Sequence, residues 1–278
     1  MSEPVRKDAF TREWRIHLFI GGILALAFFP LYLMLNISLK DNSQFMLDPW
    51  LPHAPFHFEN WGQAWVIVGR YISNTVFVAV TTVALTFGLT LPASYFFARY
   101  RPPCYRLLWY FFIILMLMPG VASLIPLFLL IKGMGLLNSL MALVVLGVAG
   151  AQVFQIFILR NFIEDIPGEL FEAAEMDGAG HIAMLRNVVI PMSGSIISTL
   201  AILQLLGVWN DFLMPMLLIA DDEKLTLAAG LIKLDGEYVK QWGPMMAGYS
   251  IAAIPLVVIF LFTMRLFVKG LAAGAIKG

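Results

Sequence analysis

Residues 161–191 read NFIEDIPGELFEAAEMDGAGHIAMLRNVVIP and separate two long apolar runs of the chain. Pro167 and Gly168 interrupt the segment near its start. Glu169–Asp177 is then predicted to be a short helix with acidic residues in its first turn, where the helix dipole favours them. Gly178 is able to take the left-handed conformation that ends a helix. The segment is therefore too long and too ordered to be a simple connector.

The stretch after Gly178 has the periodicity of a second amphipathic helix. The apolar residues that we expect on one face are Ile182, Leu185, Val188 and Val189. Pro191 marks the entry to the next apolar run. The whole segment is thus predicted to be a helix, a turn and a return helix.

The first of these helices has the composition of a docking surface. Ala173 and Ala174 give it a face almost free of side chains, which allows another backbone to approach closely. Arg186 is the only Lys or Arg of residues 162–191, against six acidic residues. These acids are Glu164, Asp165, Glu169, Glu172, Glu175 and Asp177. A solvated pair of surface helices would carry similar charges, but small residues beside ordered acids favour docking into a basic socket.

The rest of the chain is apolar enough to require a bilayer. Hydrophobic residues make up 60% of the 278 residues and charged residues only 13%, against about 25% charged in typical globular chains. A helix needs about 20 apolar residues to cross the hydrocarbon core, because its backbone groups must be satisfied within the segment. Six stretches qualify: 17–37, 71–98, 107–131, 139–159, 193–219 and 245–268. We therefore predict an all-α membrane protein with six transmembrane helices.

The distribution of Lys and Arg predicts the orientation of these spans. With both termini in the cytoplasm, twelve of the 18 Lys and Arg residues lie inside and six outside, as the positive-inside rule expects. The reverse orientation would place Arg99, Arg101 and Arg106 outside. The first apolar run is too long for the core of a signal peptide and is followed by no cleavage motif, so it is predicted to be a retained helix.

These boundaries predict one membrane domain with short additions. The predicted parts are a cytoplasmic tail (1–16), a first span (17–37), a periplasmic segment (38–70), a core of five spans (71–268) that contains the segment 161–191, and a cytoplasmic tail (269–278). The periplasmic segment is rich in proline and aromatic residues. It is either a belt of rings at the headgroup level or a surface that meets an outside partner.

Several classes of function have no support in the sequence. Cys104 is the only cysteine and the four histidines are scattered, so no disulfide and no metal site are predicted. The net charge is zero, which gives no reason to expect a nucleic-acid partner. The chain has no G-x-x-x-x-G-K-[ST] phosphate loop, so it is not expected to bind ATP or to be an enzyme itself.

The segment also carries a specific family resemblance. Glu172-Ala173-Ala174 is followed after three residues by Gly178, after nine more by Val188, and then by Ile190-Pro191. This spacing resembles the EAA loop of bacterial ABC importer permeases, with Val188 and Ile190 as conservative departures from Ile and Leu. The resemblance extends over nearly the whole chain and is closest to carbohydrate permeases of the maltose-transporter inner-subunit type. Supporting stretches are 135–139 (GLLNS), 172–179 (EAAEMDGA), 209–213 (WNDFL) and 270–278 (GLAAGAIKG).

This resemblance implies a type I ABC importer permease fold in a bacterial inner membrane, with a coupling helix that docks on a cytoplasmic ATPase. The implied ATPase-coupling residues are Glu172, Ala173, Ala174, Asp177, Gly178, Val188, Ile190 and Pro191. A contact of the tail with the ATPase is implied at Gly274, Ala275, Ile276 and Lys277. The implied partners are a second related permease, two ATPase subunits that hold ATP and Mg, and a periplasmic or surface solute-binding protein. The solute would be a sugar or a related polyol.

Polar residues inside the predicted spans are candidates for a translocation path, since such residues are costly in lipid and usually face the bundle interior or a cavity. They are Asn74, Gln152, Gln155, Gln204, Asn210 and Asp211. Asp211 either lines the path or serves as a structural or interfacial group. An ion-gradient-driven secondary transporter or channel is the alternative function. The spans lack paired charges, however, and such a carrier needs no docking segment.

Overall fold

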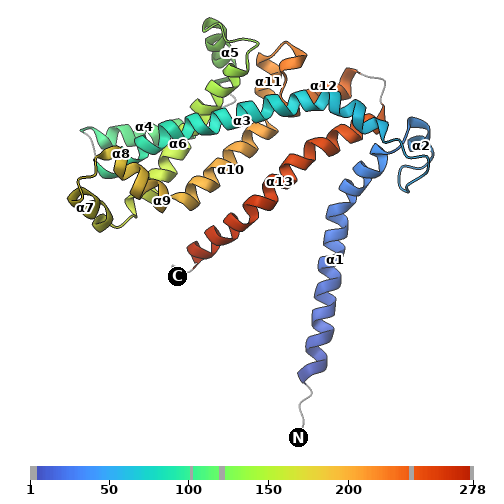
Figure 1. Ribbon diagram of the computed structural model, residues 1–278, viewed down its shortest axis with the longest axis horizontal. Coiled ribbons are helices and arrows are strands. Elements are labelled where there is room, and N and C mark those ends of the chain that lie inside the picture. The colour runs from blue at the N-terminus through green and yellow to red at the C-terminus, as the bar shows by residue number, and fades with distance from the viewer. Residues whose placement is uncertain (1–4, 101–102, 119–122, 238–240, 276–278) are drawn as a thin grey trace. The chain divides into compact units, whose positions relative to one another are not determined.

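The computed structural model describes residues 5–100, 103–118, 123–237 and 241–275, and every regular element in these ranges is a helix (Figure 1). The chain forms two compact units, and the long helices α3 (Glu59–Arg99) and α13 (Trp242–Ala275) each contribute residues to both. The first unit comprises residues 1–69 and 233–255, and the second comprises residues 70–232 and 256–278.

The first unit joins α1 (Val5–Ser38) and α2 (Asn42–Leu47) to the beginnings of α3 and α13. The carboxamide of Asn60 on α3 donates to the carbonyl oxygens of Ser38 and Lys40, at 2.9 Å each. A Cβ atom at Gly243 would clash with the Lys40 carbonyl oxygen, so glycine is required where α13 starts. Ala64 and Val68 are buried in this unit. Their packing explains why α3 begins at Glu59, well before the predicted start of the second span at residue 71.

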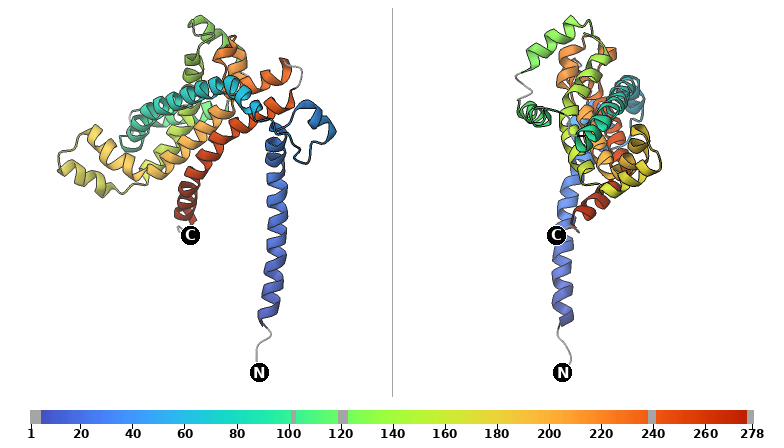
Figure 2. Two further views of the ribbon diagram at one scale, coloured as in Figure 1. Left: turned by 45° about the vertical axis from the view of Figure 1, so that its right-hand side comes forward. Right: turned by 90° about the vertical axis from the view of Figure 1, so that its left-hand side faces the viewer.

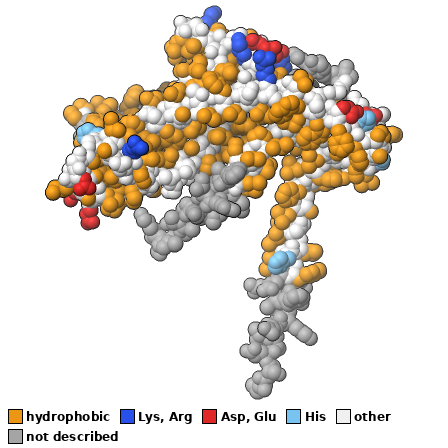
Figure 3. Space-filling model, in the orientation of Figure 1, with side chains coloured by type: hydrophobic (Ala, Val, Ile, Leu, Met, Phe, Trp, Pro, Cys, Tyr) orange, Lys and Arg blue, Asp and Glu red, His pale blue; other side chains and the backbone are white. Residues whose placement is uncertain are grey.

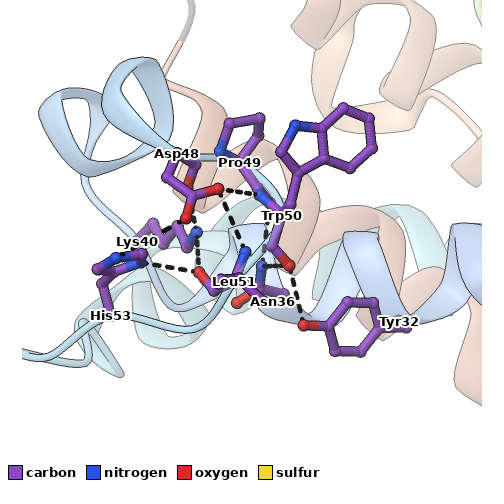
Figure 4. A network of polar contacts seen from close by, with 8 residues as sticks. All are labelled: Tyr32, Asn36, Lys40, Asp48, Pro49, Trp50, Leu51 and His53. Atoms are coloured by element: carbon purple, nitrogen blue, oxygen red, sulfur yellow. Dashed lines mark hydrogen bonds and ion pairs between the residues drawn. The ribbon is translucent and has the colours of Figure 1, made fainter.

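The segment 39–58, between α1 and α3, is folded around a buried lysine (Figure 4). The side chain of Lys40 is 1% exposed, and its ammonium donates to the carbonyl oxygens of Asp48 and Leu51 at 2.5 Å each. The carboxamide of Asn36, which lies on α1, donates to the carbonyl oxygens of Pro49 and Trp50. Because one cation and one amide hold four consecutive carbonyl groups, residues 48–51 are fixed against the end of α1.

Trp50 extends this contact down the side of α1. Its ring stacks on Phe29, with centroids 6.1 Å apart, and its carbonyl oxygen accepts a hydrogen bond from the Tyr32 hydroxyl at 2.9 Å. Trp50 itself is 57% exposed, and its neighbour Leu51 is exposed too. An exposed indole at the outer end of an apolar helix suits the headgroup region, although the same surface would also suit an outside partner.

The second unit contains most of the helices, among which α6 and α10 run side by side (Figure 2). Its elements between the two long helices are α4 (Tyr105–Leu117), α5 (Leu124–Gly133), α6 (Leu140–Glu164), α7 (Gly168–Met176), α8 (His181–Met184), a π-helical turn (Leu185–Val189), α9 (Ile190–Met192), α10 (Gly194–Asn210), α11 (Leu213–Leu218), a 3₁₀ turn (Asp222–Lys224) and part of α12 (Leu227–Glu237).

Small polar residues allow α3 and α6 to pack closely in this unit. Thr82, Thr86, Thr90 and Ser94 recur at helical spacing on α3 and are all completely buried. A Cβ atom at Gly147 of α6 would lie 2.8 Å from Cγ2 of Thr82, so only glycine fits there. Interfaces between membrane helices are commonly built from such small side chains.

Four helices are long and apolar enough to cross a membrane, by length and composition, within the described residues. They are Ile16–Ser38, Glu59–Arg99, Leu140–Glu164 and Trp242–Leu261. A fifth span is counted if the pair His181–Met192 and Gly194–Asn210, bent by 80°, is taken as one. The predicted third span, 107–131, corresponds to the shorter apolar helices α4 and α5. The count of six spans and the cytoplasmic termini therefore stay predictions.

The predicted fifth span, 193–219, is interrupted. Helix α10 ends at Asn210, and α11 begins at Leu213 after two non-helical residues. Asp211 supplies the local reason, because its carboxylate accepts hydrogen bonds from the backbone N–H groups of Leu213 and Met214, at 3.0 and 3.3 Å. A carboxylate in this position caps the start of a new helix instead of continuing the old one.

Candidate functional site

The segment between α6 and α10 contains the predicted short helix, shifted by one residue. Helix α7 spans Gly168–Met176, and Gly178 has a φ of 78°, which confirms that glycine ends it in the left-handed conformation. The N–H groups of Asp177 and Ala179 donate to the carbonyl oxygens of Ala173 and Ala174, at 3.1 and 2.9 Å. These bonds close the last turn of α7 and direct the chain into α8.

One aromatic residue fixes α7 to the membrane helices. Phe171 is 2% exposed and belongs to a buried cluster, in which α7, α8 and the π-helical turn meet three long helices. Helix α3 contributes Phe87, Tyr95 and Ala98, α6 contributes Leu159 and Ile163, and α10 contributes Leu200. Met184 and Val189 complete the cluster from the segment itself. Because interiors are packed as densely as organic crystals, α7 cannot move without displacing these three helices.

The end of α3 adds a cationic and aromatic clamp around Phe171. The ring of Tyr95 is stacked on that of Phe171 with centroids 6.3 Å apart, and the guanidinium carbon of Arg99 lies 4.0 Å from the Phe171 centroid. The Tyr95 hydroxyl donates to Sδ of Met184 at 3.2 Å, and the Tyr100 hydroxyl lies 2.9 Å from Nδ1 of His181. Cation–π contacts of this kind contribute about 0.5–2 kcal/mol. The clamp joins α3 to both halves of the segment.

Sequence reasoning missed this clamp. The available signal was Phe171, a large apolar residue on an otherwise acidic and small-faced helix. Tyr95 and Arg99 are also four residues apart, which places them on one face of α3. Nothing in the sequence, however, indicates that this face meets α7.

The outward surface of the segment is acidic and carries two bare apolar side chains. Met176 is 89% exposed and Ile182 is 84% exposed, and both lie near the exposed carboxylates of Glu172 and Glu175 in the sequence. Acidic side chains gather at the α7 end of the space-filling view (Figure 3). Isolated exposed apolar residues are ordinary, but two of them within an acidic docking segment are suited to a pocket on a partner.

The position of Ile182 corrects the expectation that it shares a buried face with Leu185, Val188 and Val189. Val189 is completely buried and Leu185 and Val188 pack on the cluster, whereas Ile182 faces away. Met184 takes the buried position instead. The π-helical turn adds a residue to one turn and changes the register of the face after α8.

The structure distributes the predicted coupling residues over two environments. Glu172, Ala173, Asp177 and Gly178 are exposed at α7 and its end, and Ala174 is half-buried. Val188 packs on the buried cluster, and Ile190 and Pro191 are exposed on α9. In the predicted tail contact, Gly274 and Ala275 end α13, while Ile276 and Lys277 lie outside the described residues.

Four of the predicted path residues use their amides in contacts within the chain. Gln155 donates to Gln204 at 2.7 Å, Gln204 donates to Thr86 at 2.7 Å, and Thr90 donates back to Gln155 at 3.3 Å. This network joins α3, α6 and α10. The Asn74 amide donates to the carbonyl oxygens of Glu223 and Leu225, and the Asn210 amide donates to that of Leu206.

The remaining two, Gln152 and Asp211, line one cavity of the second unit. Its volume is about 930 Å³, and its walls come from α3, α4, α5, α6, α10, α11 and the residue before α12. Most of the lining is apolar, with Met116, Phe154 and Met214 among the larger side chains. Asp211 therefore accepts backbone hydrogen bonds at the start of α11 and also lines a cavity, while its place on a translocation path stays a prediction.

Comparison with known proteins agrees with this architecture. The family model of the binding-protein-dependent transport system inner membrane component matches residues 84–273. The chain is 30% identical to the probable ABC transporter permease protein YurM of Bacillus subtilis (strain 168), with 100% of this chain and 93% of YurM covered. It is 28% identical to the melibiose/raffinose/stachyose import permease protein MelC of the same organism, with 98% of this chain and 100% of MelC covered.

A solved structure has the same fold. It is a chain of a bacterial ABC transporter involved in the import of the acidic polysaccharide alginate, with a TM-score of 0.82 and 21% sequence identity. The superposition covers 95% of this chain and 99% of that chain. The chain described here therefore belongs to the family of binding-protein-dependent transport system inner membrane components and has the fold of a type I ABC importer permease.

Proposed function

We propose that this chain is the transmembrane permease subunit of an ATP-driven importer that moves a sugar or a related polyol by alternating access. In this proposal the chain crosses a bacterial inner membrane six times and has both termini in the cytoplasm. The observation that carries the proposal is the construction of the segment 161–191. Its outer surface is open for a partner, and Phe171 anchors its inner surface among three long helices.

The energy source in this proposal is a separate protein. The chain has no phosphate loop, so ATP and Mg are held by two cytoplasmic ATPase subunits. A second related permease completes the membrane path, and a periplasmic or surface solute-binding protein delivers the solute. Membership of the binding-protein-dependent family supports this set of partners.

The chemistry of the exposed surface specifies how the ATPase is recognised. Met176 and Ile182 are apolar anchors for a pocket, and the acids around them, including Glu172 and Glu175, favour a basic rim. Buried apolar anchors supply most of the affinity of an interface, while rim charges set its specificity and association rate. The small side chain of Ala173 lets the ATPase surface approach the backbone of α7.

The anchored inner surface converts docking into movement of the spans. When ATP closes the two ATPase subunits, α7 is carried with them, and the clamp of Tyr95, Phe171 and Arg99 carries α3 as well. The shared cluster moves α6 and α10 with it. This is coupling between two sites through rigid-body motion of packed elements.

The proposed solute class is based on the substrates named for related permeases. MelC is an import permease for melibiose, raffinose and stachyose, and it covers nearly the whole of this chain. Neutral saccharides of that kind are therefore the first solutes to test.

Reversal of one charge on α7 tests the proposed function. Glu172→Lys places a cation against the expected basic rim. It should lower both saccharide uptake and recovery of the ATPase with the purified permease, while membrane insertion remains normal. Glu223→Lys is the matched control, since it reverses an exposed charge in the outer 3₁₀ turn. Unchanged uptake in Glu172→Lys would remove the docking assignment.

A further inference from the structure

The cavity of about 930 Å³ in the second unit has no role in the contacts described above. Small-molecule sites commonly measure about 300–1,000 Å³ and combine an apolar lining with a few placed polar groups. The polar side chains that line this cavity are those of Ser123, Gln152, Asp211 and Thr226. Gln152 comes from α6, Asp211 from the break between α10 and α11, and Thr226 from the residue before α12.

Asp211 offers an unused acceptor. Its Oδ1 atom receives the backbone N–H groups of Leu213 and Met214, whereas Oδ2 has no hydrogen bond to the described residues. Asp211 is also the only charged residue among the described residues that line the cavity. A carboxylate in an apolar wall keeps its charge most favourably when a donor completes its hydrogen bonds.

Gln152 offers a donor and an acceptor together. Its carboxamide makes no hydrogen bond to any residue that the structure describes, in contrast to Gln155 one helical turn away, which is tied to Gln204 and Thr90. The two glutamines have the same chemistry and lie on the same helix. Only the one that lines the cavity is left without a partner.

Thr226 adds an unsatisfied hydroxyl to the wall. The residue is 2% exposed, and its Oγ1 atom is buried with no hydrogen-bond partner in the described part of the chain. A buried polar group without a partner is unfavourable. Because this oxygen is covered by its neighbours, the polar atoms that a ligand can reach are those of the less buried side chains, Gln152 and Asp211 among them.

We propose that this cavity is a solute subsite on this subunit, which takes an uncharged polyhydroxylated ligand and disfavours an anionic one. The inference rests on the proposed function and adds to it the residues and the charge of the solute. Hydroxyl groups donate to Oδ2 of Asp211 and exchange donor and acceptor roles with the carboxamide of Gln152. The apolar walls, with Met116 and Phe154, cover the C–H faces of a sugar ring. A carboxylate on the ligand would be repelled by Asp211 in a poorly screened environment.

The first test measures transport by the assembled importer in vesicles, with its ATPase, second permease and binding protein. The readout is melibiose, raffinose and stachyose uptake divided by ATP hydrolysed. Gln152→Leu should lower this ratio about tenfold, as loss of a ligand hydrogen bond of about 1.4 kcal/mol predicts. Thr199→Val is the control, because Thr199 lies half-buried on α10, outside the cavity, and its hydroxyl bonds to its own helix. An unchanged ratio in Gln152→Leu would overturn the subsite.

The second test detects occupancy directly and is independent of the binding protein. In the importer that carries Cys104→Ser and Ala149→Cys, a position that lines the cavity without a role in binding, alkylation of the new cysteine by an uncharged maleimide is timed with melibiose and with melibionate, its oxidised anionic analogue. Melibiose should slow alkylation and melibionate should not. Adding Asp211→Asn, which keeps the capping oxygen but removes the charge, should allow melibionate to slow it too.

The possible failures are distinguishable. If the unmodified importer takes up none of the three saccharides, the proposed solute class fails. If it takes up melibiose but melibiose does not slow alkylation at position 149, the subsite fails and the function stands. Equal effects of melibiose and melibionate without Asp211→Asn would overturn the assigned role of the charge.

Discussion

At the scale of single residues, the proposed coupling rests on Phe171, which packs α7 against three long helices. The acids and small residues around it face outward, and an isolated acidic helix has little reason to stay ordered against a membrane protein. Burial of one aromatic ring between Tyr95 and Arg99 supplies that reason. Aromatic side chains bury a large area with few rotatable bonds, which suits a contact that has to be both strong and rigid.

Truncation of this ring should separate the two faces of α7. Phe171→Ala removes a buried aromatic side chain, a change that typically lowers the free energy of unfolding by about 3–5 kcal/mol. Uptake should fall strongly while the ATPase still hydrolyses ATP, because α7 then moves without α3. Uptake and ATP hydrolysis are measured in the same vesicles. Phe171→Leu keeps most of the packing and should retain part of the uptake; equal losses in both variants would contradict a packing role.

Asp48 makes the stability of the segment 39–58 dependent on pH in the acidic range. The backbone N–H of Trp50, followed by that of Leu51 and the nearby charges of His53 and Lys40, lowers the pKa of the Asp48 carboxyl below its usual 3.8. A lowered pKa in the folded state means that the ionised carboxylate stabilises the segment above the ordinary pKa, and that this contribution is lost as the pH falls through the lowered value. The protection of the Trp50 and Leu51 amides against hydrogen exchange, relative to their intrinsic rates, should therefore fall below about pH 4. Asp48→Ala should exchange quickly already at neutral pH, and identical exchange in both proteins would contradict this role.

At the scale of elements, the segment 161–191 was the most predictable part of the chain. The helix at α7 and the left-handed Gly178 follow from local rules of propensity and capping, and the structure confirms both. The buried face of the return helix was wrong at Ile182, because a π-helical turn changed the register. A prediction from periodicity assumes a regular helix, and no local sequence pattern indicates the extra residue in the π-helical turn.

The positions at which the long helices begin and end were predicted less well than the apolar runs themselves. The start of α3 at Glu59 depends on the burial of Ala64 and Val68, and the break before α11 depends on the backbone hydrogen bonds of Asp211. Both are tertiary or side-chain effects that hydropathy does not contain. The polar side chains of the spans were found from the sequence. Their division into a structural network and a cavity required the contacts.

The network of Gln155 and Gln204 should behave as a unit that holds α6 and α10 together. Gln204→Leu removes the acceptor of the Gln155 amide and the donor to the Thr86 hydroxyl, and each interhelical hydrogen bond in a membrane is worth about 0.6–1.7 kcal/mol. The melting temperature of the purified permease complex should fall. The double variant Gln155→Leu, Gln204→Leu should recover part of the loss, since it replaces both ends by apolar groups. An additive further loss would contradict the pairing.

At the scale of the whole molecule, the proposed ATPase-docking segment and the proposed solute subsite are two separate sites of the chain. The segment 161–191 and its clamp pack against α3, α6 and α10, and in the proposed function they receive movement from the ATPase. The cavity with Gln152 and Asp211 involves the same three helices and α11. A displacement of α7 therefore reaches the cavity through helices common to both sites, as alternating access requires.

The claim that α7 docks on an ATPase is tested most directly by a cross-link. Cysteine is placed at Met176, which is 89% exposed, in a Cys104→Ser background, and a short bifunctional reagent is added to the assembled importer. The control places cysteine at Met46 of the outer segment, which is 74% exposed. Docking predicts that the cysteine at position 176 cross-links to the ATPase subunit and that the one at position 46 does not. An uncross-linked position 176 in an importer that is actively transporting would contradict it.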